Sequence, residues 1–459
     1  VFGETHIGGS VSGVWTEGDS PYIVESTLTI ESGDTLIIQP RVAVQFTSND
    51  TLRVFGTLLA KGAAGDSIFF VGSDLSSWKG IWFYNETAST SELEYVSIER
   101  PLYGVRAQYC SPLIRFCTIK AHSAGVYAYY ADFELFECDI DVEGLEVNGV
   151  RLRGSNVSVN RCNISAKNLS PTRLAVGIRA YLSEPEVYNS TINVDGVGIS
   201  FGCWLDYVDK AVFSYNLINV ISQSQSQGVF LFESRYPVFV NNTIAVASGH
   251  YADKCIYAYQ NSHPTIENCI LYGDKFSNGV VASDGCNPLI GYTDIYNHTD
   301  NLIGCSVGPG CISQDPLFVD SDKGDFNLMV HSPCIDAGNP AAPFDPDNTV
   351  ADMGCYPVTQ VTYVPPQDLS NPLDYYLVEA YPNPFNPTIR LQINIPTRQE
   401  VNLSIYNLNG ELVREIVAST LDAGMHHFTW NAVNSASGIY WAVLATDETR
   451  NALQLIRLK

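Results

Sequence analysis

Cysteine is the residue whose spacing in this sequence first suggests chemistry. The stretch GVRAQYCSPLIRFCTI (residues 104–119) is soon followed by GVYAYYADFELFECDI (residues 125–140), and each ends with a cysteine two positions before an isoleucine. Thiolates at regular spacing could bind a metal or carry out redox chemistry. A tetrahedral metal site needs ligands that converge, whereas Cys117, Cys138 and Cys162 supply one ligand per repeat and form a column. We therefore expect these cysteines to pack inside the protein as small hydrophobic side chains.

The two stretches belong to a longer repeat, which has no helical segment. Its opening strands recur at intervals of 21 to 28 residues, and each is followed by a short closing strand that ends in Ile or Leu. Short alternating strands with this period indicate a solenoid, in which each coil buries its apolar face against the next, about 4.8 Å away. An antiparallel sandwich would need hairpin turns such as Asn-Gly, and these are scarce here. Prolines mark matching corners between the strands, at Pro112, Pro185, Pro237, Pro264 and Pro288.

The repeat resembles the right-handed parallel β-helix family, the architecture of pectate lyases and many surface proteins, over roughly residues 20 to 335. The resemblance implies an all-β fold with a β-helix at 1–335, of which 1–75 form the N-terminal capping coils. The chain begins at Val1, so we expect a mature chain from which an export signal has been removed.

Composition and charge limit the classes of function that this chain can have. The net charge is −24, which argues against nucleic acid as a partner, because binding it requires clustered cations. No apolar run approaches the 18 or so residues of a transmembrane helix, so we expect no membrane span.

A different pattern follows the repeat. Residues 336–376 are predicted to form a closing loop and a Pro-rich linker. In the loop, DPDNTVAD places carboxylates at alternating positions, as calcium sites do. Asp345, Asp347 and Asp352 are therefore candidate calcium ligands, and the sequence suggests no other cofactor. An Asx-turn loop with solvated carboxylates is the alternative. Disulfides are also candidates, between Cys305 and Cys311 and between Cys334 and Cys355.

The last segment, 377–459, consists of alternating strands and short turns and predicts a small β-sandwich. Its YPNPFNP start, Trp430 and Tyr440 resemble the type A C-terminal sorting domain of the type IX secretion system, which is similar to an immunoglobulin-like module. The resemblance implies export through the periplasm to the cell surface or the extracellular space. It also implies that the secretion and surface-anchoring machinery are partners.

The opening strands also predict an exterior strip, made of the two side chains of each strand that point away from the core. The first predicted column is Trp82, Arg106, Tyr127, Arg151, Arg179, Ser200, Phe230, Tyr257 and Val281. The second is Tyr84, Gln108, Tyr129, Arg153, Tyr181, Gly202, Phe232, Tyr259 and Ser283. These columns contain arginines but no Asp or Glu, and Glu233 and Asp284 follow just after their strands.

Three interpretations of the strip remain open. Its rings and arginines could bind an acidic polysaccharide, could dock another subunit or the C-terminal sandwich, or could only stack on one another. A lyase would need a calcium-binding acidic cluster beside Arg or Lys, and a hydrolase two carboxylates. We therefore expect a structural, adhesive or self-assembling extracellular element. A polysaccharide-binding protein, or a lyase or glycoside hydrolase with the strip as its cleft, is the alternative.

Overall fold

The structure, a computed structural model, describes residues 4–73, 78–250, 252–359 and, apart from short gaps, 376–457. The chain forms two compact units, Val1–Val361 and Thr362–Lys459. Most of the predicted Pro-rich linker, residues 360–375, lies outside the described residues.

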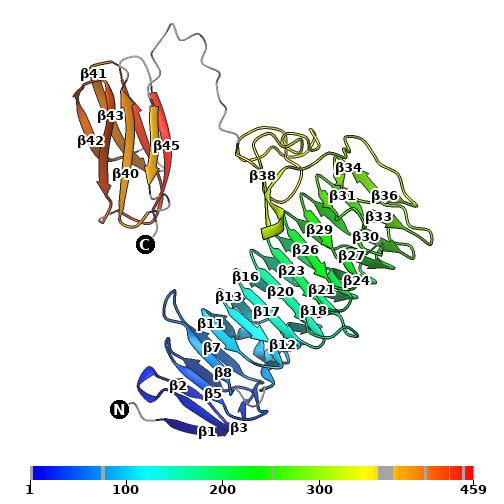
Figure 1. The fold of residues 1–459 in the computed structure, drawn as a ribbon. Coiled ribbons are helices and arrows are strands. Elements are labelled where there is room, and N and C mark those ends of the chain that lie inside the picture. Colours follow the sequence, from blue (N-terminus) through cyan, green and yellow to red (C-terminus); the bar gives the residue numbers. More distant parts are fainter. Residues whose placement is uncertain are drawn as a thin grey trace. The chain divides into compact units, whose positions relative to one another are not determined.

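The first unit is a parallel β-solenoid of about 11 turns, as predicted (Figure 1). Each coil contributes strands to three ladders, all with parallel pairing. The strands of ladder 1 are β6 (Thr51–Val54), β9 (Gly80–Tyr84), β12 (Tyr103–Gln108), β15 (Ala124–Tyr129), β18 (Val147–Arg153), β21 (Ala175–Tyr181), β24 (Ser200–Asp206), β27 (Ser226–Phe232), β30 (Lys254–Tyr259), β33 (Asn278–Ala282) and β36 (Asp300–Ile303).

Ladder 2 is joined to ladder 1 through the long strand β3, which pairs with both β5 and β6. Its strands are β1 (Thr5–Ser10), β3 (Tyr22–Ile30), β5 (Ala43–Phe46), β8 (Ile68–Gly72), β11 (Val96–Glu99), β14 (Thr118–Ala121), β17 (Asp139–Gly144), β20 (Asn163–Asn168), β23 (Thr191–Gly196), β26 (Leu217–Ser222), β29 (Thr243–Ala247), β32 (Ile270–Tyr272) and β35 (Asp294–Tyr296).

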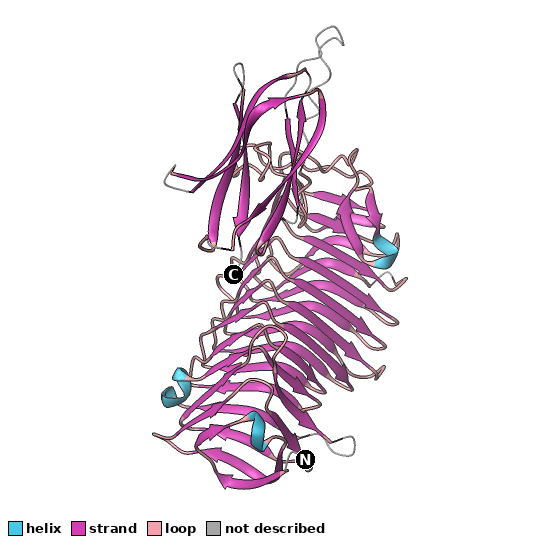
Figure 2. Ribbon diagram, turned by 90° about the vertical axis from the view of Figure 1, so that its left-hand side faces the viewer, coloured by secondary structure: helices cyan, strands magenta, loops and turns pink. Residues whose placement is uncertain are grey.

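Ladder 3 is a face that the two-strand repeat did not distinguish. Its strands are β2 (Gly13–Trp15), β4 (Thr35–Ile38), β7 (Thr57–Lys61), β10 (Glu92–Glu94), β13 (Leu113–Arg115), β16 (Glu134–Phe136), β19 (Ser158–Asn160), β22 (Glu186–Tyr188), β25 (Val212–Ser214), β28 (Val238–Val240), β31 (Thr265–Glu267) and β34 (Leu289–Gly291). The recurring prolines, such as Pro112 and Pro185, come directly before these strands, where a missing N–H costs no ladder hydrogen bond. The described residues of the unit also include the short 3-10 turns η1 (Glu17–Asp19), η2 (Glu86–Thr90) and η3 (Ser321–Lys323) (Figure 2).

The cysteine column lies in the core, as predicted. Cys117, Cys138 and Cys162 are each at most 1% exposed. The same column continues with polar side chains that accept hydrogen bonds from the backbone of the preceding coil. Cys162 N donates to Ser190 Oγ at 3.1 Å, and Ser190 N donates to Asn216 Oδ1 at 2.9 Å. The column therefore fills the core and satisfies backbone groups at the corner between ladders 3 and 2.

The register of one coil differs from the prediction. Gly202, rather than Gly198, is equivalent to Gly228, because Cys203 pairs with Val229 and Trp204 with Phe230. Ser200 is fully buried and Gly202 is buried as well, so neither belongs to the exterior strip. The prediction failed because GISFGC and GCWLDY both fit the Gly-led pattern, and the wrong glycine was aligned.

After the last coil the chain returns along the side of the solenoid. Residues 312–358, which include β37 (Phe318–Asp320) and β38 (Asp325–Leu328), form a covering segment over the outer face of ladder 2. Its Phe326 and Met353 are buried in one cluster with Leu217 and Ile270 of ladder 2. The side chain of Asn241 also donates to the backbone oxygen of Asp352 at 2.7 Å.

The structure forms neither candidate disulfide, and all twelve cysteines are free thiols. Cys305 Sγ donates to the Val280 carbonyl in ladder 1, and Cys311 Sγ donates to the Ile290 carbonyl in ladder 3. Different faces of the solenoid thus hold the two sulfur atoms of the first pair. In the second pair, Cys334 Sγ donates to the Asp294 carboxylate instead of bonding to a second sulfur atom.

The second unit consists of two antiparallel sheets, in agreement with the predicted β-sandwich. One sheet has the order β39 (Tyr376–Tyr381), β40 (Thr388–Ile395) and β43 (Gly424–Asn431). The other has the order β42 (Leu412–Leu421), β41 (Gln399–Asn407), β44 (Gly438–Ala445) and β45 (Arg450–Arg457). Trp430 and Tyr440 of the sequence motif meet in its core, with ring centroids 5.1 Å apart.

Candidate binding surface

The exterior strip lies on the outer face of ladder 1, where register places equivalent side chains one coil apart. Trp82, Arg106, Tyr127, Arg151, Arg179, Trp204, Phe230 and Tyr257 pair in succession down its first column. Its second column runs Tyr84, Gln108, Tyr129, Arg153, Tyr181, Asp206, Phe232 and Tyr259. All thirteen aromatic and arginine residues of the two predicted columns are therefore in register on one face. Parallel pairing places neighbours roughly 4.8 Å apart.

The arginines of the strip are held against aromatic faces. The Arg106 guanidinium lies over Trp82 and Tyr127, with 4.9 and 5.4 Å to the ring centroids. Arg151 lies over the other side of Tyr127, at 5.1 Å. Arg179 lies over Trp204 at 4.6 Å. Cation–π attraction of this kind fixes the orientation of each guanidinium before any ligand arrives.

The end of the strip nearer the C-terminus is aromatic and carries no arginine. Phe230 lies between Trp204 and Tyr257, at ring-centroid distances of 5.5 Å to each. Phe232 and Tyr259 form the corresponding pair in the second column, with ring centroids 5.8 Å apart. The strip therefore has two parts, a cationic half from Arg106 to Arg179 and an aromatic half from Trp204 to Tyr259.

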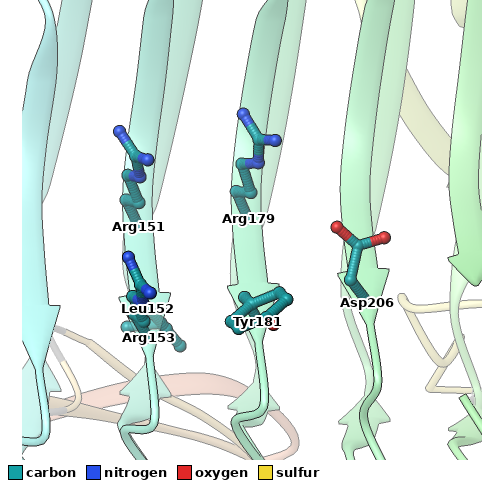
Figure 3. A pocket seen from close by; sticks show the side chains of 6 residues that line it. All are labelled: Arg151, Leu152, Arg153, Arg179, Tyr181 and Asp206. Carbon is teal, nitrogen blue, oxygen red and sulfur yellow. The ribbon is translucent and has the colours of Figure 1, made fainter.

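A pocket opens where these halves meet. It is lined by Arg151, Leu152, Arg153, Arg179, Tyr181 and Asp206 (Figure 3). In Figure 3 the Arg151 and Arg179 side chains run side by side along neighbouring strands and point in the same direction. Asp206 faces them from the next coil, and the Tyr181 ring forms the lower wall. The pocket thus presents guanidinium N–H donors, one ring and one carboxylate.

The pocket carries more positive than negative charge, from three arginines and one carboxylate. Burial lowers the pKa of Arg179, and the nearby positive charge of Arg151 lowers it further. Burial raises the pKa of Asp206, while the hydrogen bond from Trp204 Nε1, 2.6 Å long, and the charge of Arg179 oppose that rise. Arginines elsewhere in the chain, such as Arg115, Arg161 and Arg173, form ion pairs within 4.0 Å, whereas no such pair is found for Arg106, Arg151, Arg153 or Arg179 among the described residues.

Trp204 and Asp206 were missed by the sequence prediction, which had found no acid in the exterior columns. The error follows from the register of one coil, since alignment on Gly198 hid both residues. The signal was present in GCWLDY, which fits the same Gly-led alternation as GVFLFE when Gly202 is aligned with Gly228.

The candidate calcium loop has another role in the structure. Asp345 Oδ2 accepts from the backbone N of Asp352 at 2.6 Å, and Asp352 Oδ1 accepts from the backbone N of Asp336 at 2.8 Å. Asp347 accepts from the Thr349 hydroxyl at 2.8 Å. The carboxylates thus brace turns of the covering segment. Among the described residues, no group of three or more His, Cys, Asp or Glu side chains could hold a metal.

One Cys–His contact in the core has the residue types of a nucleophilic pair. Cys255 Sγ lies 3.9 Å from His298 Nε2, and His298 Nδ1 lies 2.8 Å from Ser277 Oγ. Burial raises the pKa of Cys255 and lowers that of His298 to about 4. Both groups are therefore neutral at pH 7, and Cys255 has no access to solvent, so the contact stabilises the core.

Comparison with known families agrees with both units. Residues 202–311 match the model of the right-handed beta helix region, and residues 379–457 match that of the secretion system C-terminal sorting domain. A search of curated proteins found no match. Among the described residues, no helix has the length and apolar character needed to cross a bilayer. The protein is thus exported to the cell surface or the extracellular space, and it is a right-handed parallel β-helix protein with a type IX secretion sorting domain at its C-terminus.

Proposed function

We propose that this protein is a non-enzymatic structural or adhesive element of the cell exterior, and that the exterior strip is its contact face. The observation that carries the proposal is the continuous row of arginine and aromatic side chains on ladder 1. Within the described part of the first unit, the strands of ladder 1 make their extensive contacts with other strands of the solenoid and with η2. Long rows of this composition are uncommon on surfaces without a partner.

Binding of the full chain to native extracellular material tests the proposal. Replacing Tyr127, Tyr129, Arg151 and Arg153 together with alanine should reduce binding at least about tenfold, because rings and guanidinium groups are lost from adjacent coils. Electron microscopy of the same samples would reveal self-assembly. Tyr188→Ala combined with Arg161→Ala, away from the strip, is the matched control. Equal binding by the strip variant and the control would contradict the proposal.

A second candidate, a polysaccharide-degrading enzyme, is favoured by Asp206. This carboxylate lies in the pocket with Arg179 and Tyr181 and has a raised pKa, as general acids do. Glycoside hydrolysis generally uses a pair of carboxylates roughly 5 to 10 Å apart, and Asp206 is the single acid in the two columns from Trp82 to Tyr259. We expect no release of unsaturated or reducing sugars from acidic polysaccharides. Release that Asp206→Asn abolishes would establish the enzyme instead.

A further inference from the structure

Three guanidinium groups line the pocket beside a single carboxylate, that of Asp206, and none of them forms an ion pair within 4.0 Å among the described residues, an arrangement that indicates a ligand. Arg151 and Arg179 pair in register on adjacent strands, and Arg153 lies two residues after Arg151 on the same strand. Their charges repel one another, and the two better buried groups have also lost part of their hydration. An anion placed among them would relieve both costs, because charge-assisted hydrogen bonds are among the strongest in proteins.

Each arginine presents a fork of paired N–H donors, and the number of forks in the pocket favours a tetrahedral anion over a planar one. A carboxylate has two oxygens in one plane and pairs best with one bidentate arginine. The pocket offers three forks from two coils, held by Tyr127, Tyr129 and Trp204, so an ester with three free oxygens uses more of the donors. Asp206 on the third coil disfavours a doubly charged group. A sulfate ester, with one negative charge, therefore fits better than a phosphate ester, which carries close to two.

The surroundings of the pocket indicate what bears the ester. The Tyr181 ring lines the pocket and is 37% exposed, and the aromatic half begins on the next coil with Trp204. Aromatic faces of this kind stack on the apolar faces of sugar rings. We propose that the pocket is a subsite for the sulfate ester of a sulfated polysaccharide, an inference that rests on the proposed function and names the ligand of the same contact face.

The test uses the full chain and four polymers with one backbone: dextran, dextran sulfate, dextran phosphate and carboxymethyl-dextran, the last three at equal degree of substitution. Titration calorimetry should give a Kd for dextran sulfate at least about tenfold below those for the phosphate and carboxymethyl polymers, and no binding of dextran. Arg151→Ala combined with Arg179→Ala should weaken sulfate binding at least about tenfold. Arg151→Lys combined with Arg179→Lys should lose the preference for sulfate, because lysine keeps the positive charge but lacks the paired N–H donors of a guanidinium group.

Arg161→Ala is the matched control, because Arg161 is an exposed arginine already paired with Glu137 at 3.3 Å. Its affinity for dextran sulfate should equal that of the unchanged chain, and thermal unfolding should show that all variants remain folded. Equal affinity for sulfate and carboxymethyl polymers, tighter binding of dextran phosphate, or an unchanged Kd in the double alanine variant would each overturn the inference. Loss of the sulfate preference while native material still binds through the strip would leave the proposed function standing.

Discussion

Two outer faces of the same solenoid are treated differently by the chain. On ladder 2 the positions that point outward in β26, β29 and β32 include Leu217, Ala245 and Ile270, and the covering segment buries them. On ladder 1 the outward positions of the same coils hold Phe230, Phe232 and Tyr257, which remain half-exposed. The outer face with aliphatic side chains is thus the one that a segment of the same chain covers. The outer face with aromatic and arginine side chains, which combine an apolar surface with polar groups, is not covered by that segment.

The largest expected difference between the faces is in stability. Phe326→Ala removes a ring that is 3% exposed under the covering segment and should lower the free energy of unfolding by about 3 kcal/mol. Phe230→Ala, on the open strip, should lower it by about 1 kcal/mol or less, because its ring is already partly in water. Chemical denaturation of both variants measures the difference. Equal losses would mean that the strip is as much a part of the core as the covered face.

A pH effect should also separate the faces. Burial under the covering segment raises the pKa of Asp294 from 3.8 to about 6. The folded state therefore holds this proton more tightly than the unfolded state, so Asp294 destabilises the fold above pH 6 and this penalty is relieved as the pH falls towards 4. Between pH 7 and pH 5 the unchanged chain should gain about 1 kcal/mol of stability relative to Asp294→Asn. Parallel stability curves for the two proteins across this range would contradict the assignment.

These differences show how far the sequence allows prediction. The repeat, the inward cysteines and most of the strip follow from a strict alternation of side chains within each coil, because neighbouring coils repeat the same local pattern. Trp204 and Asp206 were missing from the predicted strip because either Gly198 or Gly202 could be aligned with Gly228. The packing of the covering segment on ladder 2 was not predicted either, since its contacts join residues such as Asn241 and Asp352, which are 111 positions apart and share no local pattern.

Within the strip, Asp206 adds a negative charge where the cationic half meets the aromatic half. Asp206→Asn keeps an oxygen that can accept from Trp204 Nε1 but removes a negative charge beside Arg179. Affinity for dextran sulfate should rise about threefold, which corresponds to roughly 0.7 kcal/mol. Calorimetry measures the change, with Asp195→Asn on ladder 2 as a control for net charge. A fall in affinity would show that the carboxylate contacts the ligand directly.

The smallest expected effect concerns metal removal. The carboxylates of Asp345 and Asp352 accept backbone hydrogen bonds within the covering segment. A chelator should therefore shift the unfolding temperature by less than about 1 °C. A larger fall, reversed by added calcium, would restore the calcium site predicted from the sequence.

Hydroxyl-radical footprinting of the full chain locates the surface that the partner contacts, which we propose to be the strip. Oxidation of each aromatic side chain is compared with and without native extracellular material. Contact through the strip should protect Tyr127, Tyr181 and Tyr257 on ladder 1 and leave the oxidation of Tyr188 on ladder 3 unchanged. Protection of Tyr188 with unchanged oxidation along the strip would contradict it.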